Sequence, residues 1–184
     1  MINNNILAAL VVVAILISVV GTSLVFMSNY GNIRGYATGI TNLDIESETT
    51  LTMVRSTVSF GTLSLGGTED TTDNNPAPFL MRNDGSVLVR ITVEATDLFI
   101  KAPNPSSNYQ FMCGGTLEVP ICPLGSALVW TNMPTTGSLV PLISRLGFAD
   151  DHDEIEAEIS VTVPGDEPAG SKTSIVTFTA TEAI

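Results

Sequence analysis

The ten residues Glu154-Ile-Glu-Ala-Glu-Ile-Ser-Val-Thr-Val163 alternate polar and apolar side chains without a break. Successive side chains of a β-strand point to opposite faces of its sheet. One face would carry Ile155, Ala157, Ile159, Val161 and Val163, and the other Glu154, Glu156, Glu158, Ser160 and Thr162. The stretch therefore predicts a strand with one buried face and one solvated, largely acidic face.

Other strand patterns lie on both sides of this stretch. Residues 87–95 alternate in the same way after an Asn83-Asp84-Gly85 turn signal, and residues 174–181 place Val176, Phe178 and Ala180 on one face. The inward residues of the first of these runs are Val87, Val89, Ile91, Val93 and Ala95. Residues 51–60 and 63–65 are weaker strand predictions.

Clusters of Pro, Gly, Asn and Ser at 66–78, 103–108, 134–138 and 164–171 predict loops between the strands. Residues 139–148 could form a short helix, and no long amphipathic helix is expected after residue 45. Several short strands at this spacing favour an antiparallel β-sandwich of the Ig-like or pilin type over residues 41–184.

The N-terminal region has a different character. Residues 1–33 contain no Asp, Glu, Lys or Arg, and residues 6–27 read ILAALVVVAILISVVGTSLVFM. As a helix this run would be roughly 33 Å long, which matches the hydrocarbon core of a bilayer. The overall prediction is thus an α+β layout, with a hydrophobic N-terminal helix followed by the sandwich.

Three interpretations of this segment compete: a cleaved secretory signal, a simple membrane anchor, and a helix that packs against copies of itself. A signal is disfavoured because the run lacks a basic start and exceeds the usual length of such a core. Small residues at four-residue spacing, as at Ala14, Ser18 and Thr22, suit close helix packing. The assembly helix is predicted to use Ile6, Leu7, Leu10, Val11, Val12, Val13, Ala14, Ile15, Leu16, Ile17, Ser18, Val19, Val20, Gly21, Thr22, Leu24, Val25 and Phe26.

Three glycines follow the apolar run, at Gly31, Gly35 and Gly39. Each weakens a helix by roughly 1 kcal/mol, so we interpret them as a hinge or linker. Residues 1–40 then form the helix and linker, and residues 41–184 form the head domain.

Composition argues against several function classes. The chain has 184 residues with 19 acids and seven bases, a net charge of −12, which opposes binding to nucleic acid. His152 is the single histidine, and no phosphate-binding loop, Walker lysine or GxSxG elbow occurs. We therefore expect no enzyme activity, no cofactor, no metal site and no small-molecule substrate.

Cys113 and Cys122 are the two cysteines, and a Gly- and Pro-containing stretch separates them. The pattern favours a disulfide formed in an oxidising compartment, with two buried or free thiols as the alternative. The spacing excludes a CxxC redox site.

Acidic side chains are densest at Asp150-Asp-His-Asp-Glu154 with Glu156 and Glu158, and a second polar cluster runs from Glu69 to Asn75. Calcium needs several oxygens that converge on one point. Because alternation spreads the acids along a strand face, we interpret both clusters as solvated charge, with calcium binding as the alternative.

An apolar N-terminal helix, a short linker and a C-terminal β-sandwich resemble the layout of archaeal type IV pilin-like proteins, the adhesion pilins and archaellins. The segments Asn83-Asp-Gly-Ser86 and Val163-Pro-Gly-Asp-Glu-Pro-Ala-Gly-Ser-Lys172 also look like parts of archaeal surface proteins. The resemblance implies an extracellular helical homopolymer, with helices bundled in its core and β heads as its sheath. The subunit would reside in the membrane before assembly, and adhesion would be its role.

Two other classes remain open. One is a surface or envelope protein anchored by a single transmembrane helix. The other is a donor-strand fibre subunit, similar to TasA-like matrix fibres, in which a strand enters a neighbour's sheet.

Overall fold

A computed structural model describes residues 12–15, 46–116 and 122–184. The chain divides into two compact units, Met1–Asp44 and Ile45–Ile184. The predictions for residues 6–11 and 16–26 and for the three hinge glycines lie outside the described residues.

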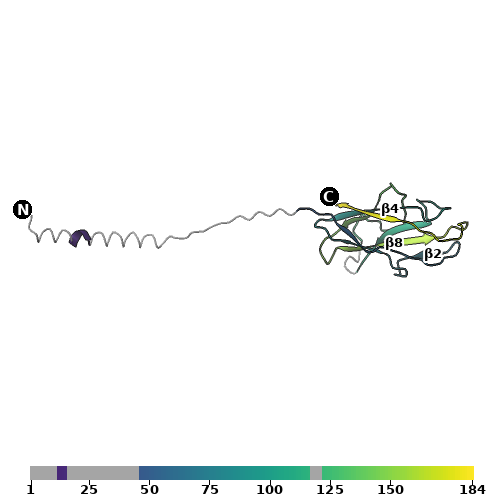
Figure 1. The fold of residues 1–184 in the computed structure, drawn as a ribbon, viewed down its shortest axis with the longest axis horizontal. Helices are drawn as coiled ribbons and strands as arrows, with labels where there is room; N and C mark the ends of the chain where they lie inside the picture. Colours follow the sequence, from purple (N-terminus) through teal and green to yellow (C-terminus); the bar gives the residue numbers. More distant parts are fainter. Residues whose placement is uncertain (1–11, 16–45, 117–121) are drawn as a thin grey trace, which may run out of the picture. The chain divides into compact units, whose positions relative to one another are not determined.

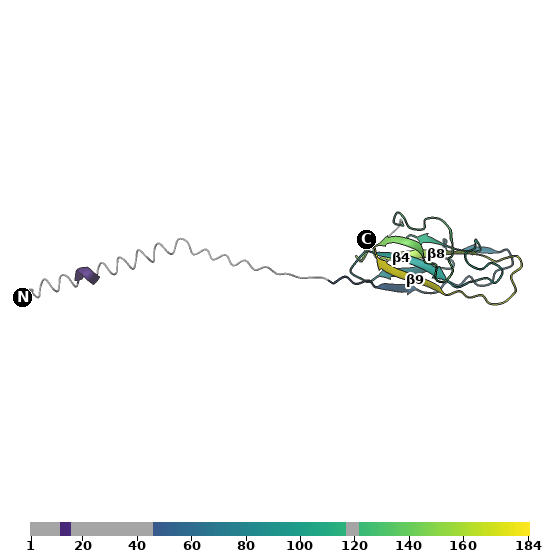
Figure 2. The ribbon, with the colours of Figure 1, turned by 90° about the horizontal axis from the view of Figure 1, so that it is seen from above.

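The second unit consists of two antiparallel sheets, as predicted (Figure 1, Figure 2). Its strands are β1 (Leu51–Arg55), β2 (Thr68–Asp70), β3 (Phe79–Asn83), β4 (Val89–Ala95), β5 (Tyr109–Gly114), β6 (Thr131–Asn132), β7 (Val140–Leu146), β8 (Glu154–Thr162) and β9 (Val176–Glu182). The larger sheet has the order β1-β3-β8-β5-β6, with β2 also paired to β8. The smaller sheet has the order β7-β4-β9.

The core lies between the two central strands, β8 and β4. The strand predicted from alternation is β8, and its residues Ile155, Ala157, Ile159 and Val161 are buried. Every second residue of β4, from Val89 to Ala95, is buried as well. Each of these strands is flanked by partners within its own sheet, and the apolar faces of both belong to one core cluster.

The sheets also meet near β9, where the rings of Phe79 and Phe178 lie edge to face with centroids 5.4 Å apart. Aromatic pairs prefer this arrangement because the positive edge of one ring faces the negative face of the other. The contact packs β3 of the larger sheet against β9 of the smaller one.

The suggestion of a short helix over residues 139–148 is wrong, because most of this segment is β7. Leu142, Ile143 and Leu146 are buried, and this spacing imitates the apolar stripe of a helix. The cause is visible in the register, since Val89 faces Leu146 but Ile91 faces Ile143. An extra residue bulges from β7 at this point and changes the period of its buried side chains.

Several weaker boundaries also need correction. β1 ends at Arg55 after a register irregularity that begins at Met53, so the predicted strand 51–60 is half as long as expected. Residues 63–65 form no strand, and β2 lies inside the predicted loop 66–78. β3, β5 and β6 were not predicted.

The chain reaches β1 through a set of hydrogen bonds that we call the N-terminal clamp, formed by residues 46–50 and residues 84–86. Ser86 donates its backbone N–H to the Glu48 carbonyl at 2.9 Å, and Glu48 donates its own N–H to the Ser86 hydroxyl at 2.9 Å. Gly85 is required between them, because a Cβ there would lie 2.3 Å from the Glu48 carbonyl oxygen. The predicted Asn-Asp-Gly turn therefore also holds the preceding chain.

Candidate functional surfaces

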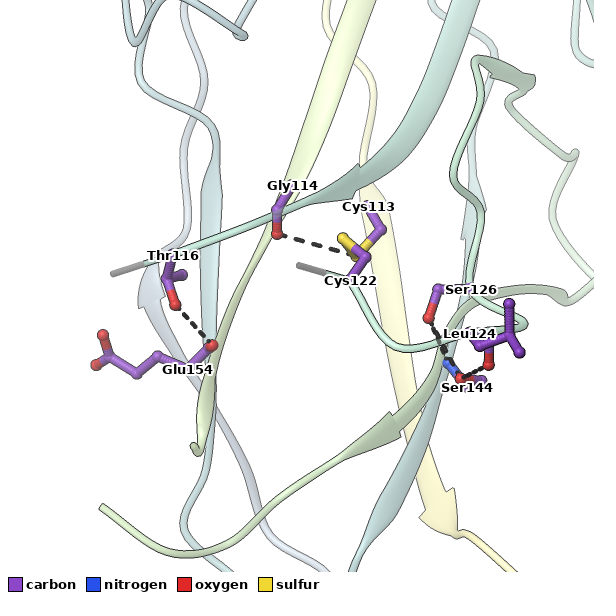
Figure 3. The surroundings of a disulfide bond; sticks show 8 residues. All are labelled: Cys113, Gly114, Thr116, Cys122, Leu124, Ser126, Ser144 and Glu154. Atoms are coloured by element: carbon purple, nitrogen blue, oxygen red, sulfur yellow. Dashed lines mark hydrogen bonds between the residues drawn. A yellow bond between two sulfur atoms is a disulfide. The ribbon is translucent and has the colours of Figure 1, made fainter. Parts of the chain in front are cut away.

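The two cysteines form a disulfide between the end of β5 and the loop that follows (Figure 3). The Cα atoms of Cys113 and Cys122 are 6.1 Å apart, within the usual range for a disulfide. Just beyond β5, the Thr116 hydroxyl donates to the Glu154 carbonyl at 3.1 Å. The disulfide therefore fastens the loop that follows β5, and the hydrogen bond of Thr116 holds the start of that loop against the larger sheet.

Beyond Cys122 the chain, which we call the bridging loop (residues 122–130), connects the two sheets. Ala127 accepts a hydrogen bond from Cys113 of β5 at 2.8 Å and donates one to Leu142 of β7 at 2.9 Å. Ser144 of β7 donates its N–H to the Ser126 hydroxyl at 3.0 Å and its own hydroxyl to the Leu124 carbonyl at 2.8 Å (Figure 3). The loop thus occupies hydrogen-bonding positions on both sheets.

The bridging loop also presents apolar side chains to solvent. Leu124 is 93% exposed, and Leu128 and Val129 are more than half exposed.

The polar face of β8 differs from the predicted solvated face. Glu158 is only 7% exposed, and the Thr71 hydroxyl donates a hydrogen bond to its carboxylate. Burial raises the pKa of Glu158, which the hydrogen bond from Thr71 only partly offsets. Gly114 provides the space, because a Cβ there would collide with this carboxylate. The sequence prediction of a fully solvated acidic face is therefore wrong at Glu158.

The other acids of β8 are placed beside arginines of neighbouring strands. Glu156 lies 3.5 Å from Arg55 of β1, and Glu154 lies 3.8 Å from Arg82 of β3. Arg55 also donates to the Pro78 carbonyl at 2.8 Å. The arginines neutralise part of the charge that the alternation concentrates on this strand.

Among the other acids of the two clusters, Asp153 is only 7% exposed, so the prediction of solvated charge is also wrong there. Asp70 and Asp73 accept backbone N–H groups two residues further along, at 3.0 and 2.9 Å, as in Asx turns. His152 is exposed and contacts Asp151 at 2.6 Å, which agrees with a surface histidine. Within residues 12–15, 46–116 and 122–184, no three His, Cys, Asp or Glu side chains are close enough to hold a metal ion.

A buried ion pair in the predicted loop 164–171 was not anticipated. The Glu167 side chain is only 2% exposed and lies 2.5 Å from the Lys172 ammonium. It also accepts the backbone N–H groups of Ile100 at 3.1 Å and Lys101 at 2.9 Å. Burial alone would raise the pKa of Glu167, but these hydrogen bonds and the lysine hold it below its ordinary value. Through these two backbone hydrogen bonds Glu167 fixes the 164–171 loop to the loop that contains Ile100 and Lys101, a contact that local sequence patterns do not reveal.

Of the proposed assembly helix, residues 12–15 are described, and their backbone is α-helical. Val12, Val13 and Ile15 are 55%, 50% and 57% exposed. Within the described part of the chain, no helix has the length and apolar character that a membrane span requires.

Comparison of the chain with protein-family models, curated proteins and solved structures gave no match.

Proposed function

We propose that this chain is the structural subunit of an extracellular type IV pilus-like filament that polymerises through its N-terminal helix and serves adhesion. The observation that carries the proposal is that the N-terminal segment is uncharged and, as a helix, would have no polar face. The β-sandwich is the head that such a filament would display.

The apolar segment supports the proposal through its need for burial. Consecutive residues of a helix are about 100° apart, so residues 12–15 cover most of its circumference. The exposed side chains at Val12, Val13 and Ile15 are all large and apolar. A helix that is hydrophobic all round has to be buried in lipid or among other helices. A bundle of identical helices meets this need in water, and a bilayer meets it before assembly.

The head supports the proposal through its charge and its disulfide. All 26 charged side chains follow residue 33, so the net charge of −12 falls entirely outside the uncharged segment. Neutral helices can meet without like-charge repulsion, while acidic heads favour hydration. The Cys113–Cys122 disulfide suits an oxidising location such as the cell surface.

The test is electron microscopy of material sheared from cells that express the full chain. The proposal expects helical fibres that contain this protein, with residues 6–27 protected from proteases. Replacing Val12 by Glu should abolish the fibres, because an isolated ion buried among apolar helices costs several kcal/mol.

The matched control is Ser107→Glu, which adds the same charge at an exposed position of the head. This variant should assemble normally. Normal fibres from Val12→Glu would contradict the packed helical core. Wild-type protein recovered only as detergent-extracted monomers, without fibres, would favour the single-helix anchor. Fibres whose subunits lack residues 1–30 would favour the donor-strand alternative.

A further inference from the structure

Apart from the three-residue β2, which pairs with β8 alone, the two sheets of the head end in four edge strands, β1, β6, β7 and β9. Unpaired N–H and C=O groups along an edge can pair with another chain, and proteins usually block them with short strands, bulges, proline, charge or a covering loop. The four edges of this head are blocked to different degrees.

Three of the edges carry such features. β1 has five residues, with an irregular register between Met53 and the charged Arg55. β6 consists of two residues. β7 contains Pro141 and a bulge, and the bridging loop bonds to its Leu142 and Ser144.

β9 carries none of them apart from the charge of Glu182 at its end. Its seven residues, Val-Thr-Phe-Thr-Ala-Thr-Glu, include no proline and no lysine, and they pair with β4 in one unbroken register. The bonds from Ala183 to Leu88 and from Thr96 to Ile175 show which groups face β4. By the alternation of antiparallel ladders, the N–H and C=O groups of Val176, Phe178, Ala180 and Glu182 point away from it. Among the described residues, β4 is the one strand that pairs with β9.

We propose that this edge pairs with β9 of a second copy of the chain, antiparallel and about a twofold axis at Thr179. In this register Phe178 faces Ala180 of the second copy, so a large side chain meets a small one. Thr177 faces Thr181, and Thr179 faces its own copy. Threonine pairs across strands stabilise a sheet.

The low charge of β9 lets two copies of an acidic chain meet at this edge. The chain carries a net charge of −12, but Glu182 is the one acid of β9, and in this register it faces Val176. On β4, Arg90 lies beside Thr181, and Glu94 lies beside Thr177. An axis at Thr179 therefore places Arg90 in the same row as Glu94 of the second copy. Moving the axis to Thr181 or Thr177 would instead align Arg90 with Arg90, or Glu94 with Glu94, but at roughly 14 Å across two intervening strands the charge preference between registers is small.

The contact has a consequence for assembly that rests on the proposed function. A polar helical filament has no twofold axis that relates its own subunits, whereas this contact is isologous. The β9 pair would therefore join subunits of two different filaments and gather filaments into antiparallel bundles.

Disulfide trapping of the full chain in detergent tests the pairing without requiring filaments. The two native cysteines are joined to each other, so an added cysteine is the one free thiol. Thr179 and its copy would form a non-hydrogen-bonded pair with Cα atoms about 4.5 Å apart, within the range for a disulfide. Thr179→Cys should therefore give a covalent dimer under mild oxidation.

The matched controls are Thr177→Cys and Thr181→Cys. Neither should dimerise alone, while a mixture of the two should form a heterodimer. The pairing would be overturned if Thr179→Cys formed no covalent dimer, or if all three single variants formed dimers equally. Either result would leave the filament proposal standing.

Charge at the axis tests the bundling. Thr179→Lys brings two ammonium groups together, whereas Thr181→Lys places each opposite a threonine. Sheared filaments of the first variant should separate into single fibres, and those of the second should stay bundled. Unchanged bundles in Thr179→Lys would contradict the role of β9 in joining filaments.

Discussion

Reduction of the Cys113–Cys122 bond should lower the melting temperature of the head by about 9 °C. The bond closes a loop with a sequence separation of nine residues. In the chain-entropy model, closing a loop of about ten residues stabilises the folded state by about 2.7 kcal/mol. A domain the size of the unit Ile45–Ile184 has an unfolding entropy of about 0.3 kcal/mol per degree, which gives the shift.

The assay is thermal unfolding of the full chain in detergent, followed by the β-sheet circular dichroism signal with and without reductant. The matched control is the double variant Cys113→Ala and Cys122→Ala. Its melting temperature should lie close to that of the reduced protein and should not change when reductant is added. A shift below about 2 °C on reduction would refute the entropic reasoning. It would mean that the hydrogen bonds of the bridging loop constrain this segment without the bond.

Three further substitutions test the polar interior. Glu158→Gln should raise the melting temperature at pH 7, because the raised pKa of Glu158 means that its ionisation disfavours the folded state. The gain should vanish below pH 4.5, the ordinary pKa, where Glu158 is protonated in both the folded and the unfolded state. Lys172→Met should lower the melting temperature at neutral pH, because the lowered pKa of Glu167 means that its ionised form stabilises the folded state above the ordinary value of 4.5. This deficit should shrink in acid, where the carboxylate becomes protonated and that stabilisation is lost. Asn83→Ala should cost at least about 1–3 kcal/mol in urea unfolding, because this buried side chain bonds three backbone groups at 3.1 Å or less. An unchanged melting temperature at neutral pH in either of the first two, or an unchanged urea midpoint in the third, would contradict the assigned contacts.

The sequence predicted the parts of the fold in which local pattern and long-range environment agree. β8 and β4 are regular central strands, so their period-two pattern survives in the structure. β7 was missed because its bulge gives buried residues a helical spacing. β5 was also missed, although Tyr109, Phe111 and Cys113 alternate and are all buried. That signal was present in the sequence and could have been used.

The candidate site was harder to predict, since its key contacts join distant parts of the chain. The disulfide could be inferred because the chain holds only two cysteines. The burial of Glu158 depends on Thr71, 87 residues away, and on the missing side chain at Gly114. Glu167 likewise meets backbone groups that lie 66 and 67 residues away. Periodicity reports which face a residue occupies, but not what covers that face.

The N-terminal clamp has a mechanical consequence for a head that is tethered at one end. Any pull transmitted through the linker would arrive at residues 46–50, where the hydrogen bonds to Ser86 and Asp84 would resist it before the apolar core does. The side-chain bonds of Ser86 to Glu46 and Glu48 are exposed, so the first response to tension would be release of the clamp and a short lengthening of the tether. The sandwich itself would stay intact during this step, and a subunit under load could yield and recover without unfolding.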